Sequence, residues 1–232
     1  MVGEVERGFE LSEASHTPVM LELRIRACHL HGRFATKANR RPAFTLKDAM
    51  ENPVRDVERI VLPPASYLHE QEKVASRWPA AVKFIQERGL NEFFGDPARD
   101  FGIVMQGGLY NGVLRALELL GLADAFGTTQ VPLYVLNVTY PLVDEEFTRF
   151  CTGKRAILVV EEGQPDFIEQ AANAMLHKAG LPTQVHGKDL LPMAGEYTGG
   201  GLITGLARFL QRCAPQVLGG RPLPPRPLPA AL

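Results

Sequence analysis

The stretch FGIVMQGGLYNGVLRALELLGL, residues 101–122, decides how the rest of the chain is organised. It opens on an apolar run with the β-branched Ile103 and Val104, which is typical of a buried strand. The run stops at Gln106, Gly107 and Gly108. Beyond the glycines, apolar residues recur at helical spacing as far as Gly121, a common helix stop: Val113, Leu114, Ala116, Leu117 and Leu120. The stretch therefore predicts a strand, a tight glycine turn and a helix.

The glycine turn is compatible with two roles. A turn at the carboxyl end of a parallel strand lies where α/β sheets bind ligands, and the free N–H groups of Gly107 and Gly108 could face an anion. A Gly-Gly turn also lets a strand and a helix pack closely without any ligand. Both roles stay open at this point.

The same alternation continues towards the C-terminus. Further apolar strands are predicted within residues 131–140, 156–160 and 182–186, and the intervening helices within 141–152, 164–178 and 202–210. Strands that alternate with helices predict a three-layer α/β/α domain with a mostly parallel sheet over residues 101–213. Residues 214–232 are rich in proline and predict an extended tail, either a spacer or a PxxP ligand.

Towards the N-terminus the pattern is less regular. Residues 17–25 alternate apolar and polar side chains and predict a half-buried strand. Residues 33–52 predict a linker, residues 65–90 one or two helices interrupted at Pro79, and residues 91–100 a loop. His29 and His31 follow the predicted strand, and they suit either a polar surface or, with a third ligand, a metal site.

Two adjacent carboxylates, Glu161 and Glu162, follow the strand predicted at residues 156–160. That position often holds catalytic acids and bases in α/β proteins. Adjacent residues on an extended chain point to opposite faces, so we expect at most one of the two to face any given cleft. The alternatives are a role at a site or interface and a solvated or ion-paired strand end.

Composition bounds the function. The chain has 232 residues, 45% hydrophobic and 22% charged, with a net charge of −1, which gives no support for a nucleic-acid or anionic-membrane partner. Cys28, Cys151 and Cys213 are far apart, so they predict reduced cytoplasmic thiols and no metal or iron–sulfur site in this chain. The acidic N-terminus lacks the apolar core of a signal peptide, and no apolar run approaches the length of a membrane span.

Five ordered motifs carry a family resemblance, from about Thr17 to Cys213: TPVMLELRIRACH, GIVMQGGLYNGVLRALELLGL, VLNVTYPL, AILVVEEGQPDFIEQ and HGKDLLPMAGEY. Together they resemble the middle of the thiamine-diphosphate-dependent 2-oxoacid:ferredoxin oxidoreductases, especially the long fused bacterial indolepyruvate enzymes. The resemblance implies oxidative decarboxylation of an aryl 2-oxoacid to an acyl-CoA, with electrons passed through 4Fe-4S clusters to ferredoxin. Such cofactors supply the chemistry, and the protein orients them.

The resemblance also implies a domain organisation. Residues 1–32 would hold the last strand of a truncated pyrimidine-binding module, 33–100 a connector, 101–213 a transketolase C-terminal-like domain and 214–232 a proline-rich tail. The residues that bind thiamine diphosphate, magnesium and the clusters would lie outside this sequence. We therefore expect a truncated, structural piece that binds no cofactor alone and is inactive alone. Its expected partners are the thiamine-binding modules, a second copy of the chain and, for the complete enzyme, ferredoxin and CoA.

Ten residues match family motif positions, and the resemblance implies that they line an interface or a cleft, with no catalytic role: Arg26, His29, Gly107, Gly108, Tyr110, Asn111, Thr139, Tyr140, Glu161 and Glu162. Direct contact with substrate or CoA is the less favoured alternative for them. The rival function is a free-standing α/β module that binds a protein or a small acid and has no part in redox catalysis.

Overall fold

The computed structural model describes residues 2–29, 31–38, 45–53 and 60–220. The chain divides into two compact units, Met1–Phe84 and Ile85–Leu232, and each is described by itself. None of the described helices is both long and apolar enough to cross a membrane.

The second unit is built on a five-stranded sheet in the order β1-β3-β2-β4-β5. Strands β2 to β5 are parallel, and β1 pairs with β3 in the antiparallel sense. The strands are β1 (Glu92–Phe94), β2 (Phe101–Gln106), β3 (Leu133–Leu136), β4 (Ala156–Val160) and β5 (Gln184–His186). The four strands predicted from Phe101 onward are confirmed as β2, β3, β4 and β5. Strand β1, in contrast, lies in residues 91–100, which were predicted to be a loop.

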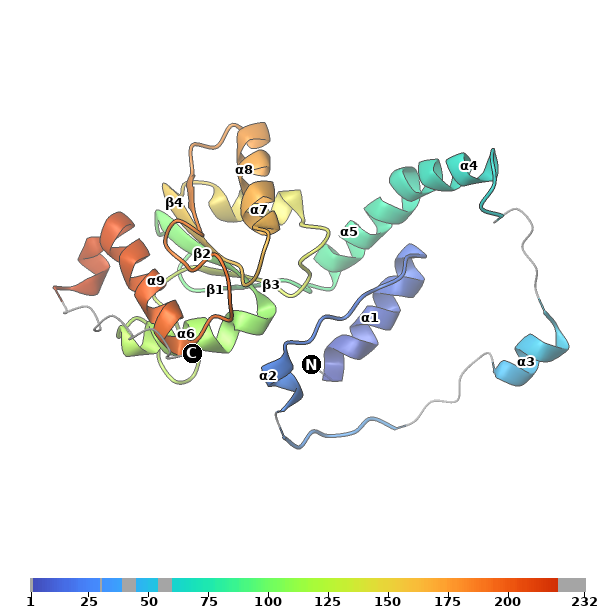
Figure 1. Ribbon diagram of the computed structural model, residues 1–232, viewed down its shortest axis with the longest axis horizontal. Helices are drawn as coiled ribbons and strands as arrows, with labels where there is room; N and C mark the ends of the chain where they lie inside the picture. The colour runs from blue at the N-terminus through green and yellow to red at the C-terminus, as the bar shows by residue number, and fades with distance from the viewer. Residues whose placement is uncertain (1, 30, 39–44, 54–59, 221–232) are drawn as a thin grey trace. The chain divides into compact units, whose positions relative to one another are not determined.

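Helices cover both faces of this sheet. The helices are α6 (Tyr110–Leu119), entered through the 3-10 turn η3 (Gly107–Leu109), α7 (Asp144–Cys151), α8 (Phe167–Ala179) and α9 (Gly199–Cys213), which leads into η4 (Pro215–Leu218). Helices α6 and α9 pack on one face, and α7 and α8 pack on the other (Figure 1). The predicted α/β fold, with a mostly parallel sheet between two helical layers, is confirmed.

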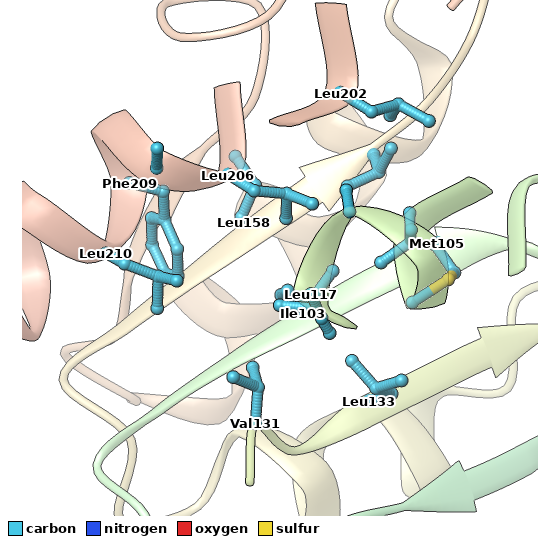
Figure 2. Close-up of a cluster of buried hydrophobic side chains, with 14 of the residues drawn as sticks. Ile103, Met105, Leu117, Val131, Leu133, Leu158, Leu202, Leu206, Phe209 and Leu210 are labelled. Atoms are coloured by element: carbon cyan, nitrogen blue, oxygen red, sulfur yellow. The ribbon is translucent and has the colours of Figure 1, made fainter. Parts of the chain in front are cut away.

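Alternate residues of the central strands supply the two layers of the core. On β2, Ile103 and Met105 belong to the cluster with α6 and α9, whereas Val104 belongs to the cluster with α7 and α8. Figure 2 shows Ile103 with Leu117 and Leu206 in the first cluster. Because β2 is buried on both faces, its sequence is nearly continuously apolar, as central parallel strands require.

The first unit is a set of helices with little core of its own. They are α1 (Val2–Ser15), α2 (Ile25–Cys28), α3 (Leu46–Glu51), α4 (Ala65–Glu72), the π-helical turn η2 (Lys73–Arg77) and α5 (Trp78–Glu87), which crosses into the second unit. Among the described residues of this unit, only Leu11, Ser15 and Ala81 are buried. Most of its apolar side chains are therefore in contact with water.

The strand predicted at residues 17–25 is wrong for this structure. Residues 18–24 have no regular secondary structure, and Ile25 already begins α2. The alternating apolar side chains stay exposed, with 45% of Leu21 and 49% of Leu23 accessible. An alternating segment becomes a strand only when a neighbouring strand supplies its hydrogen bonds, and none of the strands in the described ranges pairs with this segment.

The predicted interruption at Pro79 takes a different form. Helix α4 runs through the π turn η2 directly into α5, and Pro79 is the second residue of α5. A proline has no N–H to donate within a helix, and a wider π turn is one way for the chain to absorb such a defect. The predicted linker at 33–52 contains one short helix, α3, which begins at a capping box between Thr45 and Asp48. The extended tail predicted at residues 214–232 is wrong for its first residues, because Pro215–Leu218 form η4 and Ala214 and Leu218 are buried in the core. Residues 39–44 and 221–232 lie outside the described residues.

Candidate functional site

The carboxyl ends of the four parallel strands define one edge of the sheet, and we call this edge, with the loops that follow the strands, the carboxyl edge. Its loops are residues 107–109, 137–143, 161–166 and 187–198. Open α/β sheets bind their ligands at this edge. The fold places eight of the ten predicted site residues on these loops or in the first turn of α6: Gly107, Gly108, Tyr110, Asn111, Thr139, Tyr140, Glu161 and Glu162.

The glycine turn is held in close packing contact with the neighbouring strand end. A β-carbon on Gly107 would lie 2.3 Å from Oδ1 of Asn137, so only glycine fits without a shift. Asn137 is fixed in turn, because its Nδ2 donates to the carbonyl of Leu90 at 2.9 Å and to Glu92 at 2.8 Å. Of the two roles left open for the turn, this geometry accounts for Gly107 by close packing.

Glu161 and Glu162 point to opposite sides of the sheet, as expected for adjacent residues. The buried Glu161 carboxylate accepts hydrogen bonds from the backbone N–H groups of Ile168, at 3.0 Å, and Glu169, at 3.2 Å, in the first turn of α8. It thus acts as a built-in anion at the start of that helix. Glu162 accepts from the backbone N–H of Tyr197, just before α9. The two acids therefore do not form a catalytic pair.

Lys188 fastens three segments of the edge together. Its Nζ donates to the carbonyls of Glu161 and Gly163, at 2.5 and 2.9 Å, and to the Tyr197 hydroxyl at 2.8 Å. The Tyr197 hydroxyl donates onward to the carbonyl of Pro192 at 2.8 Å. Three acceptors match the three protons of an ammonium group, so the amine is fully engaged within the fold.

Burial is the main cause of the shifted pKa values in this cluster. It lowers the pKa of Lys188 and raises the pKa of Glu161, although the backbone N–H groups of Ile168 and Glu169 oppose the second shift. Burial, followed by the nearby carboxylates, raises the pKa of Tyr197 to about 12. Shifted pKa values are common at catalytic sites, but structural networks shift them too. Here each shifted group also bonds backbone atoms, those of α8 for Glu161 and those of the loops for Lys188 and Tyr197. These hydrogen bonds therefore hold the loops after β4 and β5 in place.

The remaining predicted residues are dispersed. The half-buried Tyr110 packs its ring 5.2 Å from that of Phe94, whereas Asn111 is exposed and Tyr140 is 79% exposed. Thr139 is half-buried. His29 is exposed in the first unit, and Arg26 lies in α2 of the same unit, so neither is part of the carboxyl edge as the second unit builds it.

Four residues that organise the edge were not predicted as site residues: Gln106, Asn137, Lys188 and Tyr197. Gln106 accepts a hydrogen bond from the backbone N–H of Glu162 at 2.9 Å, which ties the end of β2 to the end of β4. All four occur within the motifs quoted for the resemblance, so the signal was present. What the sequence lacked was the pairing of strand ends, which only the sheet order supplies.

The donor groups within the described residues do not form a site for a metal cluster. Among the described residues, no three histidine, cysteine, aspartate or glutamate side chains come together as a metal would require. Cys151 and Cys213 are buried, and burial raises the pKa of Cys151 to about 12 and also raises that of Cys213. Protonated, buried thiols are poor cluster ligands.

No family model matches the chain, but its sequence is similar to several IorA subunits. The chain is 32% identical over 197 residues to indolepyruvate oxidoreductase subunit IorA of Methanothermobacter thermautotrophicus, covering 83% of this chain and 30% of that protein. The Methanothermobacter marburgensis subunit is 31% identical, with 84% of this chain and 30% of that protein covered. The Thermococcus kodakarensis subunit is 26% identical over 202 residues, with 87% and 30% covered. The chain thus spans about 30% of the length of these relatives. It is homologous to part of indolepyruvate oxidoreductase subunit IorA.

Proposed function

We propose that this chain is the transketolase C-terminal-like portion of a thiamine-diphosphate-dependent indolepyruvate ferredoxin oxidoreductase, with a structural role and no catalytic residue of its own. The observation that carries the proposal is the similarity to IorA subunits over most of this chain's length. The five sequence motifs quoted above resemble the same enzymes and are part of the same similarity.

The geometry of the carboxyl edge favours a structural role. Glu161 caps α8, Glu162 binds the chain ahead of α9, and Lys188 has three acceptors inside the fold. A general acid or base must exchange a proton with substrate at hydrogen-bonding distance. Groups already engaged with backbone atoms would first have to break those bonds, so we assign them to holding the loops in place.

The cofactors are assigned to other portions of the complete enzyme. In this proposal thiamine diphosphate, magnesium and the 4Fe-4S clusters are held outside this chain, which agrees with the lack of a cluster of three donor side chains among the described residues. When bound there, thiamine diphosphate supplies the carbanion chemistry of 2-oxoacid decarboxylation. In this proposal residues 1–32 belong to the end of the pyrimidine-binding module and residues 33–100 connect it to the α/β domain. Ferredoxin and CoA act on the complete enzyme, and the assembly is a cytoplasmic homo-oligomer.

Reconstitution tests the proposal. The full chain is mixed with separately expressed pyrimidine-binding and diphosphate-binding portions, thiamine diphosphate and magnesium, and indolepyruvate-dependent reduction of a viologen dye is followed. We expect activity when all portions are present and none when this chain is omitted. Inactivity of the complete mixture, with every portion folded and no association between them, would instead favour a free-standing binding module.

A further inference from the structure

Three large apolar side chains at the carboxyl edge are more than half exposed. Tyr140 and Met193, in the loops after β3 and β5, are 79% and 52% exposed, and Phe167, the first residue of α8, is 67% exposed. Parallel strands end together, so three separate segments present an apolar group at the same edge of the domain. Exposed apolar groups gathered in one region are typical of interaction sites.

The base beneath these side chains is already fixed. Lys188 joins the loop after β5 to the loop after β4, and Gln106 joins the end of β2 to Glu162. Tyr197 is held by Glu162 and bonds Pro192, the residue before Met193. A surface that is rigid before binding loses little conformational entropy when a partner docks on it. The edge therefore has the preorganisation of an interface.

The charge of the carboxyl edge indicates which kind of partner surface would bind there. Carboxylates that are not buried accompany the apolar residues in the loops and in the first turn of α7: Asp144, Glu145, Glu162, Asp166, Asp189 and Glu196. Of these, Asp189 is ion-paired with Arg212 of α9. Within the described loops 137–143, 161–166 and 187–198, Lys188 is the single basic side chain, and its amine is bonded to three acceptors. Since the whole chain has a net charge of only −1, acidity is concentrated here.

Anions and a second copy of the same edge both fit this surface poorly. The start of α8, where an anion would ordinarily bind, is filled by the Glu161 carboxylate. A nucleic acid, an anionic lipid or a phosphate-bearing ligand would meet like charge from Asp166 and Glu196. Two copies joined through this edge about a two-fold axis would bring acids against acids.

We propose that the carboxyl edge docks a protein surface with an apolar centre ringed by lysine and arginine side chains, supplied by the portion of an IorA-type subunit that this chain does not span. The proposal rests on the proposed function, and it assigns a partner to the edge. Complementary charge speeds association and rejects wrong partners, and the buried apolar contacts supply most of the affinity.

The test uses the Methanothermobacter thermautotrophicus IorA polypeptide from which the region aligned with this chain has been removed. Its binding to the full chain is measured by calorimetry at low and high salt. The edge variant combines Phe167→Ala with Glu196→Lys. The matched control combines Phe126→Ala with Glu118→Lys, at a 96% exposed phenylalanine and a carboxylate near the opposite ends of the strands. Urea unfolding verifies that both variants stay folded.

We expect the edge variant to bind about tenfold more weakly and the control within about twofold of the unaltered chain. Affinity of the unaltered chain should also fall as salt rises. If the unaltered chain binds and the edge variant binds equally well, the docking face is wrong while the proposed function stands. If the unaltered chain does not bind at all, the docking face and the proposed function fall together.

Discussion

At the scale of single residues, Gly107 illustrates how a motif position can be structural. Its α-carbon lies so close to Asn137 that an added β-carbon would displace Oδ1 and disturb the bonds from Asn137 to Leu90 and Glu92. We predict that Gly107→Ala lowers the free energy of unfolding by about 1–3 kcal/mol, measured by urea denaturation. Gly199→Ala is the control, because nothing lies within 4 Å of its added β-carbon. Equal effects at the two positions would contradict the packing explanation.

Glu161 should leave a signature in the pH dependence of stability. Burial raises its pKa above the ordinary 4.5, so the folded protein holds the proton at pH values where the unfolded chain has released it. This contribution to stability is complete below the unfolded pKa and is lost as pH rises through the folded pKa. We predict that the difference in unfolding free energy between the unaltered chain and Glu161→Gln becomes less favourable to the unaltered chain as pH rises above about 4.5. Urea titrations from pH 4 upward measure it, and a constant difference would refute the assignment.

At the scale of elements, a buried polar cluster joins β3 to α7 and to the start of β1. The Tyr134 hydroxyl donates to Glu146 at 2.9 Å, and Asn91, next to β1, donates to the same carboxylate at 2.9 Å. We predict that Tyr134→Phe lowers the unfolding free energy by about 1–3 kcal/mol, because it leaves a buried carboxylate with one donor fewer. Tyr140→Phe, on a side chain that is 79% exposed, should change it by less than about 0.5 kcal/mol. A similar loss for both would mean that the cluster contributes little.

The elements also show what a sequence can and cannot predict. Strands β2, β3 and β4 were predictable because each is a nearly continuous apolar run buried on both faces. Strand β1 was missed because its three residues, two of them exposed, have no alternating apolar pattern. They form a strand only because they pair with β3. Residues 17–25 show the opposite case. They have the alternating apolar pattern of a strand, but no described strand pairs with them, so the predicted strand does not form.

The candidate site likewise has features that the sequence predicts and features that it does not. The opposite orientation of Glu161 and Glu162 followed from strand geometry alone. The roles of Lys188 and Asn137 did not, because their bonds reach segments about 25 and 45 residues away in the chain. The orientation of residues on one strand can be predicted from the alternating sequence pattern. The contacts of residues that join two strand ends can be predicted only when the order of the strands in the sheet is known.

At the scale of the whole molecule, the two units should differ in autonomy. The second unit contains both apolar clusters, whereas the described part of the first unit buries only Leu11, Ser15 and Ala81. We predict that a fragment of residues 85–220 unfolds cooperatively in urea at nearly the midpoint of the full chain, and that a fragment of residues 1–84 shows no cooperative transition. Circular dichroism measures both. A cooperative transition in the shorter fragment would show a core that the burial pattern does not predict.

We propose above that this chain has the structural role of the region that it matches in an IorA subunit. The most direct measurement is the indolepyruvate oxidoreductase activity of a chimera in which this chain replaces the aligned region of the Methanothermobacter thermautotrophicus subunit, compared with the same subunit lacking that region. Covalent joining removes any dependence on affinity between separate pieces. Our account predicts activity in the chimera and none in the deletion. A chimera that folds and assembles yet stays as inactive as the deletion would contradict it.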